Sequence, residues 1–332
     1  MQNSFPTHRL QLANIVRSAG VIPVEFLNSP QYNCEPLSQA LGCELTLKLD
    51  FTNPIRSFKG RGASFFVSER RHLGDTRAIV CASAGNWGQA MAYACRKIGL
   101  PIVVYAALNA SPLKIARMKA LGAEIRLEGD DFDAAKDAAK AYAQHINGWM
   151  VEDGYEPAVS EGHGTIAMEL FAGGNAFDAV TIAVGNGAML NGMARWIKNV
   201  APNTRVLGVC AEGAAAMEQS WRTGQLVTQA RTNTIADGIA VRVPIMAAVQ
   251  DMQGLVDDVL LVSEAQIIQA MALVHQHAGF MLEPAGAVGV AAIIAHSEQF
   301  AHKHVATVLC GSNINLAQFA QYVSQHNVVA RF

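Results

Sequence analysis

The most constraining feature of this sequence is a repeated alternation of short β-rich runs and longer helical runs. The first series predicts strands and helices in turn at residues 77–82, 87–98, 101–106, 111–121, 123–127 and 132–145. Ser111 stands before Pro112 as a natural N-cap, and Gly122 ends the same helix. Strands that alternate with helices in this way predict a parallel sheet that is covered on both faces.

A second series of the same kind fills most of the remaining chain. It predicts a helix that begins near Gly162, followed by strands and helices at residues 179–184, 190–198, 205–210, 259–262, 304–310 and 315–325. Because 332 residues exceed the usual size of one domain, we expect an α/β enzyme of two lobes, each with a mostly parallel twisted sheet flanked by helices. The predicted lobes are a large one of residues 1–76 and 154–332 and a small one of residues 77–153.

Composition narrows the class of protein. The formal net charge is -2 and no basic run occurs, so the electrostatic footprint of a nucleic-acid-binding protein is missing. No stretch reaches the roughly 20 apolar residues that span a bilayer, and the amino terminus lacks the pattern of a signal peptide. The 6 cysteines show no C-x-x-C spacing, which favours reduced thiols over disulfides or a zinc site. We therefore expect a cytoplasmic enzyme with a small-molecule substrate.

Lys59 is the first candidate catalytic residue and lies in a glycine-bounded stretch, residues 53–63. A lysine amine that attacks a carbonyl group must lose its proton near neutral pH, which partial burial or a neighbouring cation favours. Arg56 and Arg61 supply cations in the same stretch. One lysine in a polar loop is more often a solvated surface residue, so the hypothesis depends on the other motifs.

Three turns that follow predicted strands supply this support, because ligands bind at the carboxyl ends of strands in open α/β sheets. In the first turn, the Ser83 hydroxyl and nearby backbone N–H groups can hold a carboxylate, and the Asn86 amide can bond a ring oxygen. The second turn, at 184–192, is a candidate phosphate cradle, since its glycines let backbone N–H groups approach an anion. It lacks the signatures of nucleoside-triphosphate and dinucleotide sites.

The third turn follows the last predicted strand and contains Cys310 and Ser312. Both are neutral groups that can face a heteroaromatic nitrogen, although core packing is an alternative for Cys310. A lysine for an imine, a phosphate cradle, an amide near a ring hydroxyl and a neutral partner for a ring nitrogen together indicate a site for pyridoxal 5'-phosphate.

These motifs resemble, in their order, the fold type II pyridoxal-phosphate enzymes, and within them the serine and threonine dehydratases (threonine ammonia-lyases) and serine racemases. The resemblance is nearly full-length and is carried by the stretches Ser57–Ala63, Ser83–Asn86, Glu161–Ala167, Gly185–Met189, Thr234–Val241, Glu283–Val288 and Cys310–Asn313. It implies a homodimer. After the last predicted helix we expect no carboxy-terminal regulatory domain.

The resemblance also implies roles for individual residues. Lys59 would hold the cofactor as a Schiff base and act as the general base. The implied cofactor-binding residues are Phe58, Lys59, Asn86, Gly185, Asn186, Gly187, Ala188, Met189, Glu283 and Cys310. The implied substrate-binding residues are Ser83, Ala84, Asn86 and Trp87. No metal ligands are implied, because the cation-binding positions of some relatives read Cys210 and Ala216 here.

The implied reaction is an α,β-elimination that converts threonine, serine or a related 3-hydroxy amino acid to a 2-oxo acid and ammonia. Ala84 replaces the serine that racemases of this group use as a second base, which disfavours racemisation. Trp87 replaces the usual histidine, so substrate preference stays open. The alternatives are β-replacement, chemistry like that of threonine synthase, and a noncatalytic binding protein, against which the intact Lys59 argues.

Overall fold

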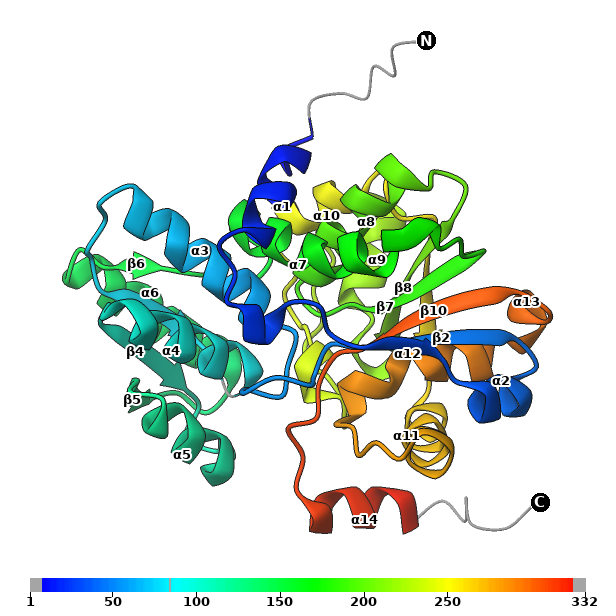
Figure 1. Cartoon of the computed structure of the whole chain (residues 1–332). Coiled ribbons are helices and arrows are strands. Elements are labelled where there is room, and N and C mark those ends of the chain that lie inside the picture. Colours follow the sequence, from blue (N-terminus) through cyan, green and yellow to red (C-terminus); the bar gives the residue numbers. More distant parts are fainter. Residues whose placement is uncertain (1–7, 84, 325–332) are drawn as a thin grey trace.

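The computed structural model describes residues 8–83 and 85–324 and contains two sheets with helices on both faces (Figure 1). The larger sheet has the strand order β1-β2-β10-β7-β8-β9, and the smaller has the order β5-β4-β3-β6. Every strand pairing in these sheets is parallel except that of β1 with β2. The predicted α/β fold with two mostly parallel sheets is therefore confirmed.

The six-stranded sheet takes strands from both ends of the chain. They are β1 (Gln31–Asn33), β2 (Glu44–Leu49), β7 (Ala179–Ala183), β8 (Arg205–Ala211), β9 (Asp258–Val262) and β10 (His304–Leu309). The surrounding helices are α1 (Leu12–Ala19), α2 (Glu35–Leu41), α7 (Pro157–Leu170), α8 (Ala188–Val200), α9 (Ala216–Thr223), α10 (Met246–Met252), α11 (Glu264–Ala278), α12 (Pro284–Ala295), α13 (Ser297–Phe300) and α14 (Leu316–Ser324).

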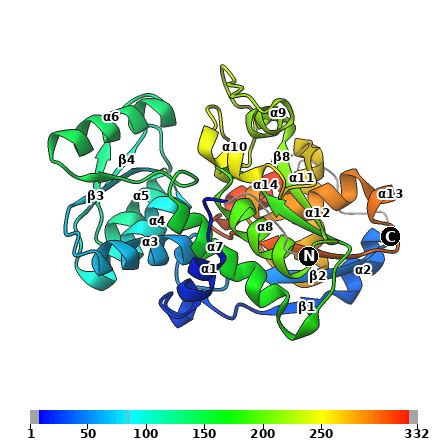
Figure 2. The ribbon, with the colours of Figure 1, turned by 90° about the horizontal axis from the view of Figure 1, so that it is seen from above.

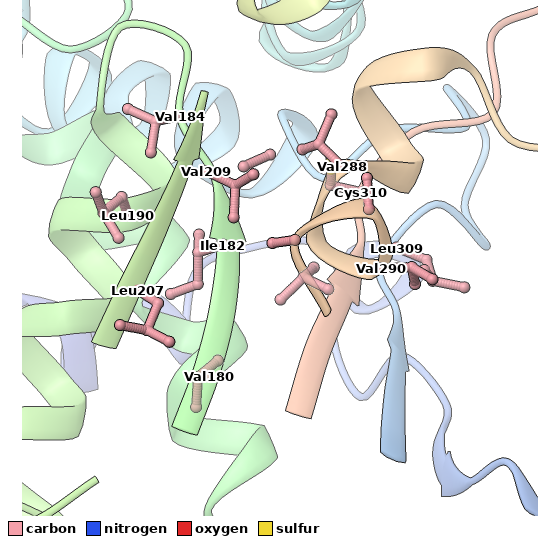
Figure 3. Packing of buried hydrophobic residues seen from close by; sticks show 14 of the residues in the cluster. Val180, Ile182, Val184, Leu190, Leu207, Val209, Val288, Val290, Leu309 and Cys310 are labelled. Atoms are coloured by element: carbon pink, nitrogen blue, oxygen red, sulfur yellow. The ribbon is translucent and has the colours of Figure 1, made fainter. Parts of the chain in front are cut away.

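Two helix pairs cover this sheet, with α7 and α8 on one face and α11 and α12 on the other (Figure 1). Helix α12 is apolar all round, which is the pattern of a buried helix, and it contacts four of the strands. It approaches them closely, since a Cβ added at Gly289 would lie 2.0 Å from Thr307 Oγ1. Figure 3 shows Ile182 of β7, Val209 of β8 and Val288 of α12 in the resulting core.

The four-stranded sheet forms the second lobe, seen beside the first in Figure 2. Its strands are β3 (Ile79–Ala82), β4 (Ile102–Ala106), β5 (Glu124–Leu127) and β6 (Trp149–Met150), and its helices are α3 (Gly60–His72), α4 (Asn86–Ile98), α5 (Pro112–Ala120) and α6 (Phe132–His145). Successive side chains of β3 alternate between two apolar clusters, as the two-residue period of a strand requires. Ile79 and Cys81 pack with Met91 of α4, whereas Val80 and Ala82 pack with Ala139 of α6.

All strands of the smaller sheet lie within the predicted small lobe of residues 77–153. Helix α3 comes from outside that range and packs against both α4 and α7. The lobe boundaries themselves stay a prediction. None of the helices in the described ranges combines the length and apolarity that a membrane crossing requires.

Three local expectations differ from the structure. Helix α7 begins at Pro157, before the predicted start near Gly162. Gly162 lies inside the helix and allows close packing there, since an added Cβ would lie 2.9 Å from Arg61 O. Lys59 is the N-cap of α3 and thus begins a helix instead of lying within a loop. Ser111 does occupy the N-cap of α5, but its side chain makes no capping hydrogen bond.

Candidate active site

A pocket lies between the two lobes, where the chain leaves the carboxyl ends of β3, β6, β7 and β10. All of the predicted cofactor-binding residues line it. The full set of lining residues is Phe58, Lys59, Asn86, Asp153, Ala183, Gly185, Asn186, Gly187, Ala188, Met189, Gly238, Ile239, Glu283, Ala285 and Cys310. The position matches the rule that ligands of parallel α/β sheets bind beyond the carboxyl ends of the strands.

Lys59 is held in the pocket by the loop that joins β2 to α3. The Asn53 side chain braces this loop by donating to Asp50 O and Ser57 O, each at 3.0 Å. The backbone N–H of Phe58 donates to Cys310 O at 3.1 Å, which ties the loop to the end of β10. Lys59 and Cys310 therefore face the same space although they are far apart in the sequence.

The immediate partner of the Lys59 ammonium is the Asp153 carboxylate, with which it forms an ion pair. The Lys59 side chain is 15% exposed, and its Nζ lies 4.9 Å from the centre of the Phe58 ring. We expected Arg61 to act as a neighbouring cation, and this expectation is wrong. Arg61 is fully buried and its charge is compensated by Asp50 and Glu169.

The turn after β7 has the geometry of an anion cradle. Gly187 is the N-cap of the thirteen-residue helix α8 and adopts φ 88°, a left-handed conformation that favours glycine. At Gly185, an added Cβ would lie 2.9 Å from Gly238 O, so a side chain there would require a shift of the backbone. The first N–H groups of α8 have no partner within the helix and point out of its positive end.

The sequence model of the pyridoxal-phosphate dependent enzyme family matches residues 24–311. The chain belongs to this family. Its curated relatives include the L-threonine ammonia-lyase of Thermotoga maritima, 32% identical over 289 residues that cover 87% of this chain and 72% of the relative. They also include the biosynthetic L-threonine dehydratase of Lactococcus lactis, 30% identical over 292 residues that cover 86% of this chain and 70% of the relative.

Solved structures agree with this assignment. The processed form of threonine deaminase isoform 2 from Solanum lycopersicum superposes with a TM-score of 0.86 at 29% identity, covering 94% of this chain and 86% of that one. Maize serine racemase has a TM-score of 0.87 at 23% identity, covering 95% of this chain and 97% of that one, and this likeness concerns the fold alone.

The pocket of this pyridoxal-phosphate dependent enzyme fits its cofactor. One Asn86 Nδ2 hydrogen goes to Glu283 Oε1 at 2.5 Å, and Asn86 Oδ1 accepts from Asn313 at 2.8 Å. Within the described part of the chain the second Nδ2 hydrogen has no acceptor, so it can serve a ring oxygen. Burial raises the pKa of the Cys310 thiol to about 12, so the group facing the pocket is neutral. A neutral thiol, a free amide hydrogen and an anion cradle match the ring nitrogen, hydroxyl and phosphate of the cofactor.

Glu283 is a buried carboxyl in the same pocket. Burial raises its pKa to about 7, and the negative charge of Asp237 acts in the same direction. The carboxyl lies close to the backbone of Gly311, where an added Cβ would be 1.8 Å from Glu283 Oε1 and would displace it. The carboxyl therefore changes its protonation near neutral pH beside the Asn86 amide.

Two of the predicted substrate-binding residues do not line the pocket. The Ser83 hydroxyl accepts from the backbone N–H groups of Gly85 at 3.1 Å and Gly88 at 2.9 Å, so it holds the turn before α4 together. Trp87 is buried in the core of the small lobe, with its ring centre 6.0 Å from Lys59 Nζ. Ala84, another predicted substrate-binding residue, lies outside the described residues.

The sequence analysis assigned no role to five further residues that line the pocket, which are Asp153, Ala183, Gly238, Ile239 and Ala285. Asp153 follows a strand of only two residues, β6, and belongs to no recognised motif. The one local signal was an acidic pair, Glu152 and Asp153, directly after an apolar residue, and such pairs are usually solvated.

Proposed function

We propose that this protein is a pyridoxal-phosphate dependent ammonia-lyase that converts threonine, serine or a related 3-hydroxy amino acid to a 2-oxo acid and ammonia. The single observation that carries the proposal is the meeting of Lys59, the Gly185–Met189 turn, Asn86 and Cys310 in one pocket. Relatives named threonine dehydratase and threonine ammonia-lyase support this choice within the family.

Each residue has a task in this reaction. The Gly185–Met189 turn binds the phosphate, Asn86 binds the ring hydroxyl and Cys310 faces the ring nitrogen. When bound, pyridoxal phosphate supplies an electron sink for a carbanion at the substrate α-carbon. Lys59 Nζ holds the cofactor and, once released by the substrate amine, accepts the α-proton.

The residues Cys310 and Ala84 favour elimination over racemisation, because neither can serve as a second base. Besides Lys59, the titratable groups that line the described part of the pocket are Asp153, Glu283 and Cys310. The raised pKa of Cys310 leaves its thiol protonated and unable to accept a proton at neutral pH. Racemisation needs a second base across the substrate from Lys59, and the residue that serves this purpose in racemases is Ala84 here.

The proposal extends to the assembly and location of the protein. We infer a homodimer in the cytoplasm, with residues 77–153 as the small lobe. Family resemblance supports the dimer and the lobe boundaries, and the absence of C-x-x-C spacing among the cysteines supports a reducing compartment. Sedimentation of the purified protein tests the dimer directly.

The experiment that tests the function uses purified protein loaded with pyridoxal phosphate and a panel of amino acids. Cofactor absorbance and 2-oxo acid release are followed together. Threonine or serine should change the spectrum and release stoichiometric 2-oxo acid and ammonia. Spectral change without 2-oxo acid would contradict the lyase proposal and favour β-replacement or simple binding.

A further inference from the structure

Asn313 carries a buried side-chain amide that joins the two lobes at Asn86. It follows β10 of the larger sheet and is only 4% exposed. Its Nδ2 donates to Ile55 O and to Asn86 Oδ1, each at 2.8 Å, and its Oδ1 accepts from Arg117 Nη1 at 2.6 Å. Both donor hydrogens and the oxygen of this amide are therefore engaged.

The two ends of this network fix the orientation of both amides in it. A guanidinium can only donate hydrogen bonds, and a backbone carbonyl oxygen can only accept them. The Asn313 oxygen therefore faces Arg117, and its nitrogen faces Ile55 O. The remaining Nδ2 hydrogen of Asn313 points to Asn86, which accepts it with Oδ1 and so turns its own Nδ2 to the pocket.

Arg117 lies on α5 of the smaller lobe in surroundings that do not compensate its charge. The side chain is half-buried, and among the described residues no carboxylate pairs with it. Burial lowers its pKa, and the positive charge of Arg56 acts in the same direction. Placing a half-buried cation near a second cation costs free energy, and such arrangements are typical of functional sites.

The orientation of Asn86 matters for the ring hydroxyl of the cofactor. This hydroxyl is acidic, and a hydrogen-bond donor stabilises negative charge on its oxygen. An Asn86 amide turned the other way would present its own oxygen to the ring oxygen, and it would set its NH2 group against that of Asn313. Because linked hydrogen bonds polarise one another, the charge of Arg117 also strengthens the donor at the far end of the network.

We propose that Arg117 is a positioning residue that acts through Asn313 to hold the Asn86 Nδ2 group toward the ring hydroxyl of bound pyridoxal phosphate. Arg117 does not line the pocket itself, so its effect reaches the cofactor through the two amides. The inference rests on the proposed function only in requiring that pyridoxal phosphate binds in this pocket.

The test compares two ligands by equilibrium dialysis, pyridoxal 5'-phosphate and 3-deoxypyridoxal 5'-phosphate, which lacks the ring hydroxyl and keeps the aldehyde that reacts with Lys59. Intrinsic differences between the ligands are the same for every variant, so a change in their affinity ratio reports on the hydroxyl. In Arg117→Met, the ratio should fall roughly tenfold below the wild-type ratio, because part of a charge-assisted network is lost. The affinity for the deoxy ligand should stay at the wild-type value.

A second variant tests whether Arg117 acts through Asn313. Asn313→Ala should lower the ratio at least as far as Arg117→Met, and the double variant should be no worse than Asn313→Ala alone. Independent roles would instead make the two effects multiply. Lys119→Met is the control, because Lys119 is an exposed cation of the same helix that does not line the pocket, and it should keep the wild-type ratio.

The outcomes separate the two proposals. An unchanged ratio in Arg117→Met overturns its positioning role, and so does an equal loss of both ligands, which would show a general effect on the fold. Multiplying effects in the double variant overturn the path through Asn313. A wild type that shows the expected ratios but releases no 2-oxo acid from any amino acid overturns the lyase proposal and leaves the role of Arg117 intact. A wild type that binds no pyridoxal phosphate overturns both.

Discussion

Two cations near the start of α3, Lys59 and Arg61, lie two residues apart and differ in their burial and in their partners. Arg61 donates to Asp50, Glu169, Thr165 and Ser29, and its side chain is fully buried. Among the described residues, Lys59 pairs with one carboxylate, which has an oxygen without a hydrogen-bond partner, and Lys59 borders a pocket. Complete satisfaction is typical of a group that holds the fold together, whereas incomplete satisfaction is typical of a functional site.

The Arg61 cluster joins three elements of the scaffold. Asp50 follows β2, Glu169 lies on α7, and Lys48 of β2 donates to Glu169 at 2.6 Å. Burial alone would raise the pKa of Glu169, but its hydrogen bonds to Arg61 and the charges of Arg61 and Lys48 lower it. Glu169 therefore keeps its negative charge, while the cluster fixes the start of α3 at Gly60.

The largest effect should come from Lys59→Ala. It removes the group that holds the cofactor and accepts the proton, so turnover should fall by more than about 10³-fold. The imine absorbance should vanish while far-ultraviolet circular dichroism stays native. An active variant with the imine absorbance intact would contradict the assignment of Lys59.

Arg61→Leu tests whether the buried arginine holds the fold together. Removing the guanidinium leaves the carboxylates of Asp50 and Glu169 buried without their main partner, which should cost about 3–5 kcal/mol of unfolding free energy. Urea denaturation measures this loss. A variant of wild-type stability would show that the cluster does not hold the scaffold together.

Glu283→Gln tests the raised pKa of a second titratable group in the pocket. The folded-state pKa of about 7 is above the ordinary value of 4.5, so the folded protein retains a proton that the unfolded chain releases. Stability should therefore fall as pH rises from about 5 to 8, by an amount on the order of 1 kcal/mol per unit of pKa difference. Thermal unfolding across this range should show the fall in the wild type and a flatter profile in Glu283→Gln. Parallel profiles would rule out Glu283 as the cause.

Arg17→Ala should have the smallest effect. Arg17 pairs with Glu69 of α3 at 2.6 Å, but its side chain is 46% exposed. Exposed ion pairs contribute less than about 1 kcal/mol, so the loss measured by urea denaturation should be a small fraction of that in Arg61→Leu. Similar losses of unfolding free energy in Arg17→Ala and Arg61→Leu would mean that burial does not determine how much each arginine contributes to stability.

Much of the fold could be predicted because its signals are local. The strand and helix at 101–106 and 132–145 were predicted almost to the residue, and Gly187 and Gly85 do precede helices. Helix α3 was missed because its sequence lacks a clear apolar period and because Arg61 in its first turn is buried by ion pairing. Strand β2 was missed for a related reason, since Lys48 reads as a solvent-facing residue but is 1% exposed.

The residues of the candidate site also divide into those that local sequence signals predicted and those that such signals could not predict. Turn chemistry after strands pointed to Asn86, the Gly185–Met189 turn and Cys310, and these residues do line one pocket. The sequence predicted that a helix begins near Gly162, because glycine usually interrupts a helix. In the structure Gly162 lies within α7 and lets this helix approach α3. Asp153 could not be found, because its burial depends on packing against residues that are distant in the sequence.

The sequence by itself determined the α/β alternation, the lysine and the turns that surround it, because period, turn residues and motif order are properties of neighbouring residues. Only the tertiary structure decided which charges meet. Lys59 pairs with a carboxylate 94 residues away, and the fully buried Arg61 pairs with Asp50 and Glu169. Charge interactions depend on distance and burial, and neither quantity exists until the chain is folded.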